Sequence, residues 1–100
     1  MEGLYCILRT KNAGVHCGVV ESIVLLQDSA MVTITAATRL YLWAKHPKGS
    51  LSLSGVAKHG ASGESRIDGI IERATVFGVI EILPCTEVAE KFLRVPRNNI

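Results

Sequence analysis

The clearest structural signal in the chain is the hexapeptide Thr38-Arg39-Leu40-Tyr41-Leu42-Trp43. Its leucines alternate with an arginine and two aromatic residues, and successive residues of a β-strand point to opposite faces of a sheet. Residues 32–35, which lie shortly before it, are all β-branched, which also favours a strand. We therefore predict a strand over residues 31–43, with leucines on one face and Arg39, Tyr41 and Trp43 on the other.

Working outward, four more segments have the pattern of strands. Each is rich in Val, Ile and Leu or alternates apolar with polar residues, and turn-forming residues or a proline bound them. These segments are residues 4–10, 15–27, 66–72 and 75–83. Gly18 lies inside the second one, and a glycine within a strand predicts a β-bulge or a close approach of another backbone.

Two helical segments are predicted between and after these strands. Residues 44–63 are rich in Gly and Ser and form the best loop candidate, with a short helix around residues 51–59. Near the C-terminus, Thr86 is a plausible N-cap and Glu87 lies in the favourable first turn. The apolar face of this second helix is predicted to consist of Val88, Ala89, Phe92 and Leu93.

Together these elements predict an α+β fold. It consists of a small antiparallel β-sheet of about five strands, a basic loop with a short helix, and a C-terminal helix that covers one face of the sheet. A chain of 100 residues has room for one domain. We place this domain at residues 1–95 and predict a frayed C-terminal tail at residues 96–100.

The composition predicts self-association. Apolar residues make up 48% of the chain, but only 5% are aromatic, so the core must be built from Val, Ile and Leu. A small domain has a high ratio of surface to volume, which leaves surplus aliphatic side chain exposed. We therefore expect a homo-oligomer; the alternative is a monomer with scattered exposed aliphatic residues.

Membrane and cysteine patterns predict where the protein acts. No apolar run approaches the roughly 18 residues of a membrane span, and no signal-peptide pattern follows Met1. The three cysteines, Cys6, Cys17 and Cys85, are odd in number and have apolar neighbours, which favours free thiols over disulfides. We expect a cytoplasmic protein with no membrane partner.

The chain also resembles a known family, through three segments that occur in order. These are 9–18 (Arg9-Thr10 to Gly18), 39–43 (Arg39-Leu40-Tyr41-Leu42-Trp43) and 79–89 (Val79 to Ala89). They are similar to an uncharacterised family of small proteins from tailed bacteriophages, a domain of unknown function. The resemblance spans about residues 5–92. It implies a viral gene expressed in the cytoplasm of an infected bacterium, and it supplies no catalytic residues.

No catalytic, metal or cofactor pattern is recognisable in the sequence. The histidines and cysteines lack the C-x₂-C or H-x₃-H spacings of metal sites, and the glycines lack the context of a phosphate-binding loop. His16 and Cys17 are neighbours in a predicted strand and should point to opposite faces, which argues against a thiolate–imidazole pair. We therefore expect a non-enzymatic protein without cofactor or metal.

A basic stretch predicts the ligand site. Between residues 39 and 66, basic residues outnumber acidic ones by five to one, a local charge of +4, whereas the remainder carries −2. Aromatic rings can stack on a base while cations neutralise phosphate. The predicted ligand-binding residues are Arg39, Tyr41, Trp43, Lys45, His46 and Lys48. The alternative is that both aromatic rings belong to the core and the basic residues coat a loop.

These patterns leave two functional hypotheses from different classes. The first is a phage-encoded oligomeric binding protein, a host-defence antagonist that sequesters an anionic, nucleotide-type small molecule. Duplex nucleic acid is disfavoured, because a chain of net charge +2 lacks the broad basic face of duplex binders. The second hypothesis is a phage structural or adaptor protein that acts only through protein–protein assembly.

Overall fold

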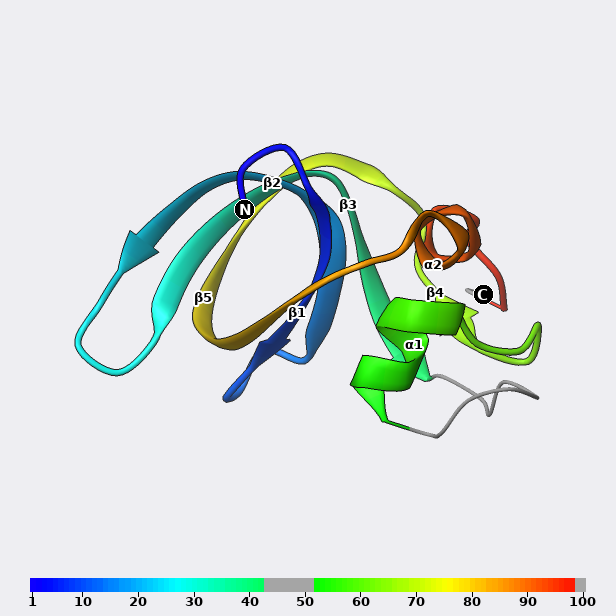
Figure 1. Ribbon diagram of the computed structural model, residues 1–100. Helices are drawn as coiled ribbons and strands as arrows, with labels where there is room; N and C mark the ends of the chain where they lie inside the picture. The colour runs from blue at the N-terminus through cyan, green and yellow to red at the C-terminus, as the bar shows by residue number, and fades with distance from the viewer. Residues whose placement is uncertain (43–51, 99–100) are drawn as a thin grey trace.

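The computed structural model describes residues 1–42 and 52–98. Its elements follow the predicted order of three strands, a helix, two strands and a second helix (Figure 1). They are β1 (Tyr5–Thr10), β2 (Val15–Leu25), β3 (Ala30–Leu42), α1 (Leu53–His59), β4 (Arg66–Ile67), β5 (Ile71–Pro84) and α2 (Glu87–Leu93). The predicted α+β fold, with five antiparallel strands and a helix near the C-terminus, is confirmed.

The sheet curls until it closes on itself. Its strand order is β2-β1-β5-β3-β4, and β2 also pairs with β3, so that β1, β2, β3 and β5 form a closed ring. The short β4 extends the sheet on the side of β3, where Leu40 pairs with Ile67. Figure 1 shows the long strands curving over one another, with both helices at the end where β4 lies. Closure pairs backbone groups that an open edge would leave unpaired.

Two apolar clusters lie on opposite sides of the curved sheet. The inner core, inside the ring of strands, contains Cys6, Leu8, Val20, Ala30, Val32, Ile34, Ala37, Val76 and Val79. The outer core lies between the sheet and the helices and includes Tyr5, Ile7, Cys17, Leu40, Val56, Ile67 and Leu93. Residues of β1 alternate between the two clusters, because successive strand residues point to opposite faces. β1 is therefore buried on both sides.

Gly18 fulfils both expectations for a glycine inside a strand. The register between β2 and β3 shifts between Cys17 and Val19, so the strand is bulged at this glycine. A Cβ at Gly18 would lie 2.8 Å from the carbonyl oxygen of Thr35 and 2.9 Å from the Cβ of Ile34. The bulge and the close approach of β3 thus explain why this position has no side chain.

The two helices are attached to each other at the start of α2. The Thr86 hydroxyl accepts a hydrogen bond from the Ala89 amide at 3.2 Å, which confirms the predicted N-cap. The same hydroxyl donates to the Lys58 carbonyl at 2.6 Å, and the Thr86 amide donates to the Ala57 carbonyl at 2.9 Å. One residue therefore caps α2 and joins it to the end of α1.

Several predicted boundaries differ from the structure. The strand predicted at 66–72 is only two residues long, and β5 starts at Ile71 instead of residue 75. Residues 68–70, between these two strands, belong to no strand. The backbone of Asp68 is nevertheless bonded to β3: its amide donates to the Arg39 carbonyl at 3.0 Å, and its carbonyl accepts from the Thr38 hydroxyl. The alternating sequence pattern does not reveal this interruption.

Two details near the C-terminus also differ. Val88 is 64% exposed, so the buried face of α2 consists of Ala89, Leu93 and, in part, Phe92. Residues 96–98, placed by the sequence in a frayed tail, are hydrogen-bonded to the body of the protein: the backbones of Arg97 and Ile67 bond to each other in both directions. The tail is therefore anchored to β4 as far as the structure describes it.

The cysteines are free thiols, as predicted. Burial raises the pKa of all three, and the pKa of Cys85 is raised to about 12. Such thiols stay protonated at neutral pH and are poor nucleophiles. Among residues 1–42 and 52–98, neither helix is long and apolar enough to cross a lipid bilayer.

Candidate anion-binding groove

Strand register places Arg39 and His16 on the inner face of the sheet. Leu8, an inner-core residue, lies opposite His16 across β1 and β2, and His16 lies opposite Arg39 across β2 and β3. Residues directly opposite each other in an antiparallel pair point to the same face. Two polar side chains therefore occupy the end of the inner face nearest the β1–β2 turn.

The β1–β2 turn holds the Arg39 side chain in place. Its Nη2 donates to the Ala13 carbonyl at 3.0 Å, and its guanidinium lies 5.1 Å from the centroid of the Tyr41 ring. Gly14 has φ +82°, and a Cβ there would lie 2.8 Å from Arg39 Nη2. A glycine at this position both permits the turn and leaves room for the guanidinium.

A second guanidinium lies against the same ring. Arg66 of β4 has its guanidinium carbon 5.4 Å from the Tyr41 centroid, and its Nε donates to the Asn98 carbonyl at 3.1 Å. Within the described part of the chain, neither Arg39 nor Arg66 has a carboxylate partner, in contrast to the three arginines in the pairs Arg9–Glu81, Arg73–Glu21 and Arg94–Glu90. We call Arg39, Tyr41 and Arg66 the arginine cluster.

The arginine cluster adjoins a groove made of two connected hollows. The first has a volume of about 190 Å³, and its walls include Thr38, Tyr41 and Asp68. The second has a volume of about 300 Å³ and ends at Phe77. Both hollows are lined by His16, Arg39 and Ala74, which join them into one feature that we call the Arg39 groove.

His16 is neutral where it lines the groove. Its Nε2 lies 2.7 Å from the Ala13 carbonyl, which can only accept a hydrogen bond, so the proton is on Nε2 and Nδ1 remains an acceptor. Burial lowers the pKa of His16 and the nearby charge of Arg39 lowers it further, while the hydrogen bond to Ala13 opposes them. The cationic character of the groove therefore comes from the two arginines.

Comparison with known proteins gives one match. A family model for a domain of unknown function, DUF6948, matches residues 3–93. The chain belongs to the DUF6948 family. Neither the comparison with curated proteins nor that with solved structures produced a match. The family match agrees with the domain of unknown function that the sequence resemblance implied, and residues of both hollows lie within the matched region.

The structure brings together two of the six predicted ligand-binding residues. Arg39 and Tyr41 share one face of β3, and Tyr41 is 48% exposed, so this ring is not part of the core. The remaining four predicted residues lie outside the described part of the chain; they are Trp43, Lys45, His46 and Lys48.

The sequence prediction missed four residues: His16, Asp68 and Phe77, which line the groove, and Arg66, which lies against the Tyr41 ring of its wall. Arg66 contributed to the basic stretch, but nothing in the sequence indicated that β4 pairs with the end of β3. From the sequence, His16 was considered only as a metal ligand and as a partner of Cys17, which lies in the outer core on the opposite face. Only the pairing of strands brings these four residues close to Arg39 and Tyr41, and the sequence alone does not give that pairing.

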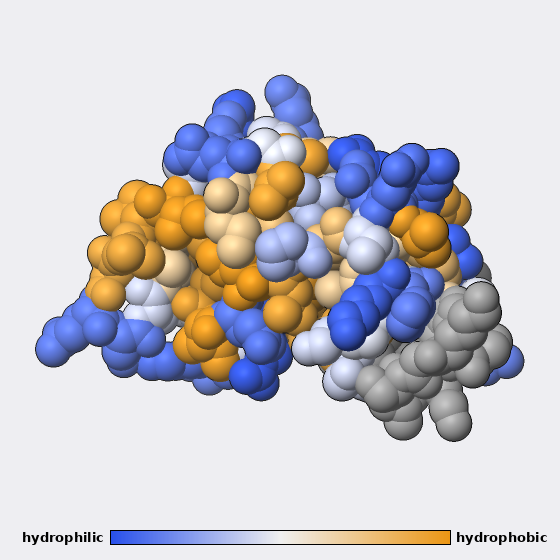
Figure 2. All heavy atoms as spheres, in the orientation of Figure 1, coloured by the Kyte–Doolittle hydropathy of each residue, from blue (hydrophilic) through white to orange (hydrophobic). Residues whose placement is uncertain are grey.

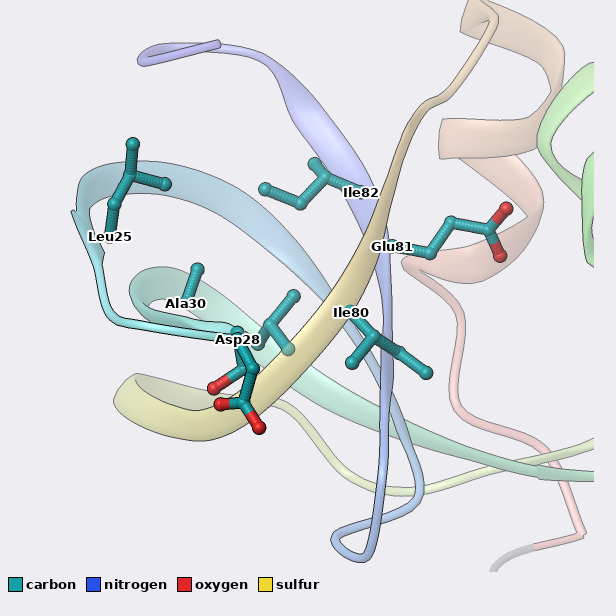
Figure 3. Close-up of a pocket in the computed structure, with 8 residues that line it drawn as sticks. Leu25, Asp28, Ala30, Ile80, Glu81 and Ile82 are labelled. Carbon is teal, nitrogen blue, oxygen red and sulfur yellow. The ribbon is translucent and has the colours of Figure 1, made fainter.

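A further hollow, of about 390 Å³, lies between the β2–β3 turn and β5. Figure 3 shows Ile82 pointing toward Leu25 and Ala30 of the hairpin, while Glu81 points away. The nearby carboxylates are neutralised, because Asp28 pairs with Lys11 at 2.7 Å and Glu81 pairs with Arg9 at 3.1 Å. The lining of this hollow mixes polar with apolar side chains and, among the described residues, includes no cation.

Metal chemistry has no obvious place in the groove. Within residues 1–42 and 52–98, no group of three or more His, Cys, Asp or Glu side chains is arranged to hold a metal ion. Besides hydroxyl groups, the lining of the groove offers a ligand the guanidinium of Arg39, the neutral imidazole of His16 and the carboxyl group of Asp68, and the guanidinium of Arg66 lies against the Tyr41 ring of its wall.

Proposed function

We propose that this chain is a non-enzymatic binding protein that holds an anionic, nucleotide-type ligand in the Arg39 groove. We also propose a bacteriophage origin, as the sequence resemblance implies, and a role in the infected bacterial cytoplasm as a host-defence antagonist that sequesters this ligand. The proposal is carried by the arginine cluster, in which two guanidiniums lie on one ring without a carboxylate partner among the described residues.

An anion at the arginine cluster would relieve an electrostatic cost. Two guanidiniums beside one ring repel each other, and within the described chain neither is ion-paired with a carboxylate, although Asp68 lines the same hollow as Arg39. A phosphate group accepts hydrogen bonds from the fork of an arginine in a bidentate geometry. Each charge-assisted hydrogen bond contributes about 1.5 to 3 kcal/mol. Hydrogen bonds from two arginines to one phosphate can therefore supply several kcal/mol of binding free energy, although the contact area is small.

The groove residues also support binding over catalysis. His16 is neutral and uses one ring nitrogen to bond the Ala13 carbonyl. The nearest thiol in sequence, Cys17, is completely buried in the outer core, and burial raises its pKa. Covalent catalysis needs a nucleophile hydrogen-bonded to a base, and the described residues that line the groove contain no such pair.

The test is calorimetric titration of the purified protein with nucleoside monophosphates and, separately, with sulfate. We expect the wild-type protein to bind a nucleotide, and Arg39→Ala and Arg66→Ala each to weaken binding by roughly 10- to 150-fold, the equivalent of about 1.5 to 3 kcal/mol. Arg73→Ala is the matched control, because Arg73 is paired with Glu21 outside the groove. Absence of nucleotide binding by the wild-type protein would refute the proposal.

A second candidate function is structural: a phage adaptor that acts through protein–protein assembly only. The observation that favours it is the run of exposed apolar side chains at the β2–β3 hairpin, Val24, Leu25 and Leu26, of which Leu25 is 81% exposed. Figure 2 shows hydrophobic side chains gathered over this end of the molecule. Both the nucleotide-binding protein and the structural adaptor could form a homo-oligomer through this surface. Nucleotide binding is therefore the measurement that distinguishes the two functions.

A further inference from the structure

Asp68 places a carboxylate in a groove that is otherwise cationic. It lines the first hollow together with Arg39 and Tyr41 and is half-buried there. Its backbone amide and carbonyl are both used, by the Arg39 carbonyl and the Thr38 hydroxyl. What Asp68 can offer a ligand is therefore its side chain. Within the described residues, this carboxylate has no hydrogen-bond or ion-pair partner.

The first hollow thus presents groups of both charges, because Arg39 and Asp68 both line it. The arginine cluster attracts an anionic group, whereas a carboxylate repels phosphate and accepts hydrogen bonds from N–H donors. The unprotonated Nδ1 of His16 adds another acceptor to the same lining. A ligand that uses both kinds of group must therefore carry a phosphate and, in another part of the same molecule, N–H donors, as a nucleotide with a donor-bearing base does.

The base that best matches a carboxylate is guanine. Its Watson–Crick edge presents two adjacent donors, N1–H and the N2 amino group, and the two oxygens of one carboxylate can accept both. Adenine presents one amino donor beside a ring nitrogen that is an acceptor, and this acceptor would face a carboxylate oxygen. Hypoxanthine keeps the N1–H donor but lacks the amino group, so it separates the two contacts.

We infer that Asp68 is a specificity-determining residue, which selects a guanine nucleotide by accepting hydrogen bonds from the base while the arginine cluster holds the phosphate. This inference rests on the proposed function, because it names the base of the ligand that the groove takes. It assigns the two ends of the ligand to separate residues, so the two contacts can be tested separately.

The experiment measures the affinities of GMP, IMP and AMP by calorimetry for the wild-type protein and for Asp68→Asn. The asparagine has the same shape but replaces one acceptor oxygen with a donor, and the backbone bonds of residue 68 are unaffected. We expect the wild-type protein to prefer GMP over AMP by roughly 10-fold or more, the value of a hydrogen bond to a charged group, with IMP between them. Asp68→Asn should remove this preference.

Two controls separate the base contact from the phosphate contact. Glu72→Gln removes a similar charge from an exposed position of β5 that does not line the groove, and it should leave the order of affinities unchanged. Arg39→Ala should weaken all three nucleotides by similar factors. The wild-type series alone also tests the inference, so the result does not depend on the folding of a variant.

The outcomes distinguish the inference from the proposed function. Equal affinity of the wild-type protein for all three nucleotides, or a GMP preference that persists in Asp68→Asn, would overturn the role of Asp68 and leave phosphate binding intact. Failure of the wild-type protein to bind any nucleotide would overturn the proposed function, and the assignment of Asp68 with it.

Discussion

Arg39 and Arg66 remain beside one ring although their charges repel each other. Each guanidinium bonds a backbone carbonyl, that of Ala13 or Asn98, and each lies within cation–π distance of Tyr41. A cation–π contact at an exposed site contributes about 0.5 to 1 kcal/mol. These weak contacts fix the direction of both cations without neutralising them, and fixed but uncompensated charge is what an anion site requires.

Gly14 provides a test of how the turn controls Arg39. We expect Gly14→Ala to weaken nucleotide binding by roughly tenfold, the loss of about one charge-assisted contact, because the new Cβ would lie 2.8 Å from Arg39 Nη2. It should also destabilise the fold by about 1 to 2 kcal/mol, because alanine is strained at φ +82°. Calorimetry measures the first effect and urea unfolding the second.

Gly3→Ala is the matched control. Gly3 has a similar φ of +84°, but a Cβ there meets no atom within 4 Å. The control should show the loss in stability without the loss in affinity. If both variants bind nucleotide as the wild-type protein does, the contact between Gly14 and Arg39 does not position the guanidinium for a ligand.

At the scale of elements, α2 depends on tertiary contacts. Seven residues, Glu87–Leu93, are too few for a helix that is stable alone in water. The Thr86 cap, the exposed ion pair Glu87–Lys91 and the partly buried ion pair Glu90–Arg94 add only tenths of a kcal/mol to about 1 kcal/mol each. Most of the free energy that stabilises α2 must therefore come from the burial of Leu93 in the outer core.

We therefore predict that Leu93→Ala lowers the free energy of unfolding by about 2 to 5 kcal/mol, since the change leaves a cavity at a fully buried site. Val88→Ala, on the exposed side of the same helix, should change it by no more than about 0.5 kcal/mol. Urea unfolding followed by circular dichroism measures both. Equal effects of the two substitutions would mean that α2 does not pack on the sheet through Leu93.

At the scale of the whole molecule, closing the sheet leaves aliphatic residues outside. The ring of four strands encloses a narrow inner core, and the helices cover only the end near β4 (Figure 1). The β2–β3 hairpin extends beyond both cores, and its apolar residues 24–26 are exposed. Contiguous exposed apolar surface on a small protein often marks an interface between proteins.

We predict self-association through this hairpin, so that light scattering at micromolar concentration gives a mass that is a multiple of the chain mass. Replacing Leu25 and Leu26 together by Ser should shift the protein to the monomer, because it removes most of the exposed apolar surface of the turn. Val88→Ser, which alters an exposed apolar residue on α2, is the control and should leave the mass unchanged. A monomeric wild-type protein would contradict the prediction.

Local patterns in the sequence were sufficient for the fold class. Alternation identified β3, aliphatic runs identified β1, β2 and β5, and Thr86 marked the start of α2. These signals are readable because side-chain direction and capping depend on residues close together in the chain. The sequence also predicted the bulge at Gly18 and placed Arg39 and Tyr41 on one face, because both depend on neighbours within a strand.

The tertiary structure alone decided the closure of the sheet, and with it the groove. Arg66 reaches Tyr41 only because β4 pairs with the end of β3, and His16 joins Arg39 only through the β2–β3 register. Asp68 lines the first hollow because its backbone is bonded to β3, in the segment between β4 and β5 that alternation misassigned to a strand. Strand pairing joins residues far apart in the chain, and no local pattern in a single sequence specifies which strands will pair.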